Sequence, residues 1–295
     1  MKKIFAIAAC ASLAACSSSI PPSGNESPSA PPSTVASATP TAQTAPASQA
    51  VFTNLGDEAS LGKVTAALVA AGLPQADVDS FAEQVRSLNK AVGDGKLITS
   101  PVPLSQAKAD DGTIAQGTAS QARLTNCRIT TFTLAHSLVA IGSPAPADTS
   151  QLFIDDEQIG VAPKLFEADR TNFDVLYGRI PTTKDKDEAA RVADVEKYLA
   201  DHKVSYASGP ASVISVYIHD TLDAEGYSFV GHTGVLVDTG DGILFVEKLA
   251  FDAPYRAITF ASRSELKDYL RSMYDDGPTM DYGSPLIFEN GAPLR

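Results

Sequence analysis

Apolar residues first recur at helical spacing. They stand three or four residues apart in two successive runs, Leu61, Val64 and Leu68, then Val78, Phe81, Val85 and Leu88. Gly72 and Pro74 separate the runs, as residues that end a helix do. The pattern predicts a helical hairpin over residues 57–89, with one apolar stripe on each arm.

The spacing changes to that of strands after residue 210. Two short apolar runs, 234–237 and 243–248, are joined by Asp238-Thr239-Gly240-Asp241, a strong hairpin signal. Further strands are predicted over 213–219 and 257–260, and amphipathic helices over 187–202 and 264–274. Early helices and a late antiparallel meander predict an α+β domain.

The hairpin also predicts a pair of facing side chains. If residues 238–241 form a four-residue loop, Val237 faces Gly242 and His232 faces Glu247. Opposed residues of an antiparallel pair share a face, with Cβ atoms ~5 Å apart. Glu247 would then accept a hydrogen bond from the His232 ring. A slip of one residue would move Glu247 to the other face.

The N-terminus has the layout of an export signal. Lys2 and Lys3 precede an apolar stretch, and Leu13-Ala14-Ala15-Cys16 fits a bacterial lipobox. Residues 1–15 are therefore predicted to be a lipoprotein signal peptide, and Cys16 to carry the lipid that anchors the chain in a bilayer. The simpler alternative is an ordinary secretory signal cut near Ala15. The expected location is the extracytoplasmic side of the cell envelope, on either a cytoplasmic or an outer membrane.

Residues 16–50 are rich in Ser, Pro, Thr and Ala and predict a disordered tether after the lipidated cysteine. The remainder is divided into a helical preface, 51–100, and a larger domain, 101–295. The chain has 23 Lys and Arg against 35 Asp and Glu. Loss of Lys2 and Lys3 leaves 21 against 35, a net charge of −14, which argues against a nucleic-acid binder. No feature of the sequence predicts an oligomeric state.

Cys127 is the one cysteine outside the N-terminal segment, beside Cys10 and Cys16. A lone thiol in an exported domain is either buried and inert or kept for its reactivity. Thr125 or Asn126 could cap a helix that begins near Cys127, and a helix N-terminus lowers a thiol pKa. The alternation that follows Cys127 also fits a strand, so local propensity leaves both structures open.

Of four histidines, His232 is the best candidate base for the thiol. His136 lies about two helical turns beyond Cys127, too far along the same helix, and His202 is expected at a surface or helix end. His219-Asp220 with His232 lacks the spacing of a metal site, so no metal or other cofactor is expected.

The residues around Cys127, His232 and Glu247 resemble the motifs of two protein families. Asn126-Cys127-Arg128-Ile129-Thr130, Gly231-His232-Thr233-Gly234 and Phe245-Val246-Glu247-Lys248 resemble the signature of an uncharacterised family of bacterial surface lipoproteins. That resemblance covers about residues 52–274.

The order Cys127, His232-Thr233-Gly234, Glu247 is also similar, more distantly, to NlpC-type papain-like amidases. Glu replaces their commoner third residue, and Thr-Asn precedes the cysteine instead of the usual neighbours.

The second resemblance implies a papain-like core, in which the cysteine helix packs on an antiparallel sheet. It implies that Cys127 is the nucleophile, His232 the general base and Glu247 the group that orients the imidazole. Gln121 and Asn126 are the candidates for holding the oxyanion. The implied reaction is hydrolysis or acyl transfer at amide bonds of cell-wall peptides or acylated envelope components.

Two other functions remain open from the sequence. The domain could be a non-catalytic binding or assembly module in which Cys127 is a packed structural residue. It could also be a redox sensor that forms a reversible sulfenic acid at Cys127. A thiol beside the His232 ring with a neighbouring cleft would favour the enzyme.

Overall fold

The computed structural model describes residues 50–93, 95–107, 125–143, 145–159, 165–182, 186–220 and 226–295. The predicted signal peptide, the predicted lipidation site Cys16, nearly all of the predicted tether and Gln121 lie outside these residues. Across the described ranges, no helix combines the length and apolarity that a membrane crossing requires.

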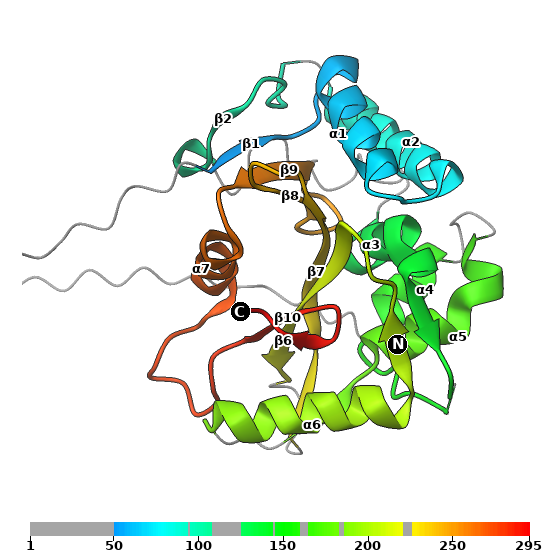
Figure 1. Cartoon of the computed structure of the whole chain (residues 1–295), viewed down its shortest axis with the longest axis vertical. Helices are drawn as coiled ribbons and strands as arrows, with labels where there is room; N and C mark the ends of the chain where they lie inside the picture. Colours follow the sequence, from blue (N-terminus) through cyan, green and yellow to red (C-terminus); the bar gives the residue numbers. More distant parts are fainter. Residues whose placement is uncertain are drawn as a thin grey trace, which may run out of the picture. The chain divides into compact units, whose positions relative to one another are not determined.

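An antiparallel sheet organises the described chain (Figure 1). Its strand order is β11-β10-β6-β7-β8-β9-β1-β2, and β4 pairs with β7 beside this path. The strands are β1 Val51–Thr53, β2 Val102–Pro103, β4 Ile180–Pro181, β6 Ala211–His219, β7 Tyr227–Asp238, β8 Ile243–Lys248, β9 Tyr255–Phe260, β10 Leu286–Glu289 and β11 Ala292–Pro293. Two further strands, β3 Val139–Ile141 and β5 Val204–Tyr206, form a separate small pair. Because β1 pairs with β9, the segment before residue 100 contributes to the same sheet as the rest.

Seven α-helices occur in the described part of the chain. They are α1 Glu58–Ala70, α2 Gln75–Val92, α3 Cys127–Ala135, α4 Phe153–Ile159, α5 Leu165–Tyr177, α6 Glu188–Asp201 and α7 Arg263–Tyr274. Side chains cap several of them, as Asp57 does for α1 and Ser262 for α7. The segment after Cys127, whose sequence is compatible with either a helix or a strand, forms a helix.

Hydrophobic residues pack on both faces of the sheet. On one face, α1, α2 and α3 share a core with alternate residues of β6 to β9, such as Val235 and Val246. On the other face, Leu266 and Leu270 of α7 pack on Leu236 and Phe245. Figure 1 shows α3 and α7 on opposite sides of the sheet. The mixed helix and antiparallel-strand architecture that the sequence predicts is confirmed.

The β7–β8 register differs from the predicted one. Asp238 faces Ile243 and Gly234 faces Glu247, so the loop is residues 239–242, one position later than expected. His232 therefore does not oppose Glu247. The shift is two residues, an even number, so both side chains stay on one face and remain diagonal neighbours. Strand β7 therefore continues one residue further than predicted, to Asp238, which pairs with Ile243.

A β-bulge interrupts β7 next to His232. Val216 of β6 pairs with His232, but the next residue, Tyr217, pairs with Val230, which leaves Gly231 as the extra residue. A Cβ at Gly231 would lie 2.3 Å from Ile218 Cδ1, so any larger residue here would force the Ile218 side chain to move. The bulge changes the direction of β7 where this strand contacts the start of α3.

Candidate functional site

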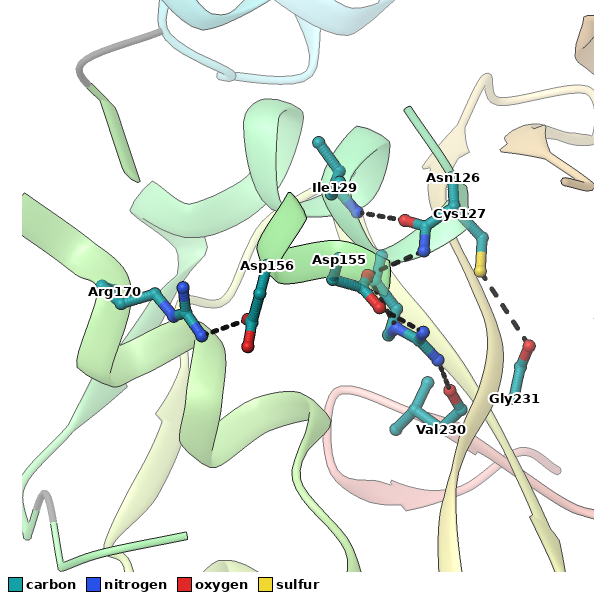
Figure 2. A network of polar contacts seen from close by, with 9 residues as sticks. Asn126, Cys127, Ile129, Asp155, Asp156, Arg170, Val230 and Gly231 are labelled. Atoms are coloured by element: carbon teal, nitrogen blue, oxygen red, sulfur yellow. Dashed lines mark hydrogen bonds and ion pairs between the residues drawn. The ribbon is translucent and has the colours of Figure 1, made fainter. Parts of the chain in front are cut away.

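The start of α3 is fixed by a side-chain cap. Asn126 has an extended backbone, and its Oδ1 accepts a hydrogen bond from the Ile129 amide at 2.9 Å (Figure 2). Its Nδ2 donates to Asp155 Oδ1 at 2.7 Å. Cys127 is thus the first residue of the helix, where amides lack helical acceptors and the helix dipole favours negative charge.

Asp155 of α4 binds two residues at the start of α3, Asn126 and Arg128. Its carboxylate is fully buried and accepts from Asn126 and from Arg128, whose Nη2 lies 2.5 Å from Oδ2. Arg128 Nη1 donates in turn to the carbonyl of Val230 at 3.1 Å, next to the bulge. Figure 2 shows how these contacts join α4, α3 and β7 around the cysteine.

Cys127 and His232 meet at the bulge. The Cys127 Sγ lies 3.9 Å from the Gly231 carbonyl oxygen. The charges of the His232 ring and this thiol interact, and the ring Nε2 lies 2.8 Å from Glu247 Oε2. Because Nε2 is bound to Glu247, Nδ1 is the nitrogen left for the thiol, and it has no hydrogen-bond partner among the described residues. The side chains are closely enclosed, with Cys127 5% exposed and His232 0%.

Other side chains hold the imidazole and its carboxylate in place. The Tyr269 hydroxyl of α7 donates to Glu247 Oε1 at 2.5 Å, so both carboxylate oxygens are engaged. The Tyr274 ring, also on α7, stacks on His232 with centroids 4.8 Å apart. These contacts fix the ring orientation, as the third group and its supports do in cysteine and serine enzymes.

The electrostatics favour a charged pair. Burial alone would raise the pKa of Cys127, but the neighbouring His232, with the charge of Arg128, lowers it below its ordinary value. Burial would lower the pKa of His232, but Cys127 and Glu247 raise it to about 9. Both shifts favour a thiolate beside an imidazolium over the neutral pair.

Lys248 is a second buried charge close to the site. Its Nζ donates to the carbonyls of Ala250, Phe251 and Ala253 at 2.5, 2.9 and 2.8 Å. Burial lowers its pKa to about 7, yet three acceptors match the three hydrogens of an ammonium. The loop it holds leads to Tyr255, whose hydroxyl lies 2.6 Å from Thr125 Oγ1, two residues before Cys127.

Lys248→Met should destabilise the fold by about 2–4 kcal/mol, because it leaves three carbonyls without their donor. Lys197 is a matched control, since its pair with Asp201 is exposed and within one helix. Lys197→Met should cost less than about 0.5 kcal/mol. Urea unfolding followed by circular dichroism gives both values, and equal midpoint shifts would mean that the Lys248 bonds contribute little.

The other histidines lie elsewhere. His136, at the end of α3, contacts Asp77 and Asp169, each at 3.2 Å. His202 lies at the C-terminal end of α6, as one of the two alternatives predicted, but it is buried instead of at the surface, with Nδ1 3.1 Å from the Ser143 carbonyl. The reason is that the chain turns back there and packs β5 against β3. Within the described residues no group of three or more His, Cys, Asp and Glu could hold a metal ion.

The site contains residues that the sequence did not single out. Asp155, Tyr269 and Tyr274 belong to segments far from Cys127 in sequence, and only the apolar stripe of α7 placed Tyr269 toward the core. Asn126, a predicted oxyanion donor, uses its amide for the cap and for Asp155. Gln121, the other predicted donor, lies outside the described residues.

Comparison with known families gives one match. A family model described as a domain of unknown function, DUF4300, matches residues 51–294, which spans every described strand and helix. Neither a curated protein nor a solved structure matches the chain. This coverage shows that the chain belongs to the DUF4300 family of domains of unknown function.

Proposed function

We propose that this chain is a membrane-anchored envelope lipoprotein whose domain is a papain-like cysteine hydrolase or acyltransferase. The observation that carries the proposal is the buried set Cys127, His232 and Glu247, in which the imidazole binds the carboxylate through Nε2, keeps Nδ1 for the thiol and lowers the pKa of that thiol. A helix start bearing the cysteine, beside a strand bearing the histidine, is the arrangement that thiol catalysis needs. The anchor rests on the lipobox at Cys16 and the tether that follows.

In this mechanism the Cys127 thiolate attacks the amide carbonyl carbon, and a C–S bond forms as the carbonyl oxygen becomes an oxyanion. The Asn126 cap occupies the Ile129 amide. The amides that precede it at the start of α3 are the donors suited to that oxyanion, since helix geometry leaves them without helical acceptors. His232 gives its proton to the leaving amine as the C–N bond breaks. The product at this stage is a thioester on Cys127.

The second half restores the thiolate. His232, now neutral, takes a proton from water or from an acceptor amine or hydroxyl, which attacks the thioester carbon. Collapse breaks the C–S bond and releases the acid or the transferred acyl product. Glu247 keeps the imidazole oriented throughout and stabilises its cationic form, and Tyr269 holds Glu247. Cell-wall peptides and acylated envelope components are the proposed substrates.

Trapping of the thioester tests the proposal. The full chain carrying Cys10→Ser and Cys16→Ser is incubated with cell-wall peptides, quenched in acid and digested. We expect an acyl mass on the peptide that contains Cys127, and loss of at least about a thousandfold of turnover in Cys127→Ala. His202→Ala serves as the control, because its ring contacts Ser143 instead of the thiol. Turnover that survives Cys127→Ala would contradict the proposal.

The enclosure of the site favours a second candidate, a binding or assembly module in which Cys127 is structural. Only 5% of Cys127 and none of His232 are exposed. On that reading, folded protein would resist thiol reagents at every pH and release its thiol only on unfolding. Fast modification of the folded chain excludes it.

A further inference from the structure

A cavity lies beside the histidine, separated from it by side chains. It has a volume of ≈ 300 Å³ and lies between the ends of β6 and α7, residues of β7 and the segment 276–285. Tyr274 lines the cavity and also stacks on the His232 ring. Ile218 lines it too and packs closely over Gly231, the residue whose carbonyl faces the Cys127 sulfur. The cavity is therefore one side chain away from the reactive pair.

One wall of this cavity is formed by two stacked aromatic rings with a carboxylate beside them. The His219 ring stacks on Tyr282 with centroids 5.2 Å apart and an interplanar angle of 19°. The Tyr282 hydroxyl donates to Asp276 Oδ2 at 2.6 Å. This hydrogen bond raises the pKa of Tyr282 to about 12, so the hydroxyl stays protonated.

The charge of the lining is negative. Among the described residues that line the cavity, Asp220 and Asp276 are acidic and none is Lys or Arg. Asp220 is neutralised by Arg179, whose Nη1 lies 3.0 Å away, and also accepts from Gln151. No described cation pairs with Asp276. Two cations contact the same segment: Lys186 donates to the carbonyl of Pro278, and Arg191 donates to the carbonyl of Ser284 and packs against Gly283.

We infer that this cavity is a binding subsite for an ammonium-bearing group of the substrate, held against the His219–Tyr282 wall and paired with Asp276. That the bound group belongs to a substrate rests on the proposed function, but binding in the cavity does not require a reactive thiol. A cation stacked on aromatic rings and facing a carboxylate gains from both contacts. Tyr274 lies between the subsite and His232, so a ligand in the cavity is one side chain away from the proposed catalytic ring.

Methionine methyl groups offer a direct readout of binding. The chain has three methionines, Met1, Met273 and Met280, and Met273 lines the cavity. The full chain with Cys10→Ser, Cys16→Ser and Cys127→Ser is labelled with ¹³C at the methionine methyls, and Met273→Leu assigns the signal. Benzylammonium chloride and sodium benzoate are the probes, because they share a ring and differ in charge.

We expect a saturable shift of the Met273 methyl signal with benzylammonium and a much weaker response to benzoate. Asp276→Asn should raise the Kd for benzylammonium about three- to tenfold, as loss of one partly exposed charge does. Asp241→Asn, on the β7–β8 loop, is the matched control and should leave it unchanged. Equal responses to the two probes, no shift of Met273, or equal effects of the two variants would each overturn the inference. Because Cys127 is absent, failure here is distinct from failure of the thiol chemistry.

Discussion

Replacement of His232 by alanine should raise the pKa of the Cys127 thiol above its ordinary value. Burial has the largest effect on this pKa, raises it and remains in the variant, whereas His232 is the main group that lowers it and Arg128 adds a smaller lowering. Each unit of pKa removes about tenfold of the thiolate present at neutral pH. The rate of alkylation by iodoacetamide at pH 7 should therefore fall at least about tenfold.

The measurement is the alkylation rate against pH, in the chain carrying Cys10→Ser and Cys16→Ser so that Cys127 is the one thiol. The wild-type midpoint should lie below 9.0, the ordinary value for a thiol here, and the midpoint of His232→Ala above it. His136→Ala is the matched control, since that ring sits at the other end of α3 between two carboxylates. An unchanged midpoint in His232→Ala would remove His232 from the site.

Loss of the Asp155 carboxylate should be the most destabilising change near the site. Asp155→Ala leaves the guanidinium of Arg128 buried without its counter-charge, and it also breaks the contact to the capping Asn126. Removal of one partner of a buried ion pair costs about 3–5 kcal/mol.

The neighbouring residue supplies the control for that prediction. Asp156 pairs with Arg170 at 2.5 Å, but that pair is largely exposed. Asp156→Ala should therefore cost less than about 1 kcal/mol. Urea unfolding of the two variants at neutral pH gives the comparison. Similar losses of unfolding free energy would show that the buried network contributes little to the fold.

Periodicity predicted the local elements because each depends on nearby residues. The apolar stripe of 264–274 and the β-branched run of 213–219 match α7 and β6 to within a few residues. The same reasoning placed His232 and Glu247 on one face, although the register was wrong by two residues. An even error preserves the face, so the contact between them forms diagonally across the strands.

Long-range contacts were not predictable in this way. Asp155 reaches Arg128 across 27 residues of chain, and nothing in the residues around Asp155 marks it as buried. The bulge at Gly231 depends on the packing of Ile218 from the neighbouring strand. Tyr274 meets His232 because α7 packs on the sheet, an arrangement that the helical pattern does not specify.

The central claim is that a protonated His232 ring lies beside a thiol of lowered pKa, and the ¹⁵N chemical shifts of His232 test it most directly. The pKa of His232 is raised to about 9 from 6.5, so the protonated ring should persist as pH rises through 7 and be lost near 9. In ¹⁵N-histidine-labelled protein at pH 7, assigned by His232→Ala, we predict two protonated ring nitrogens for His232. Cys127→Ala, which removes one cause of the raised pKa, should lower the pH at which this signal titrates. A neutral His232 ring at pH 7 in the wild type would contradict the account.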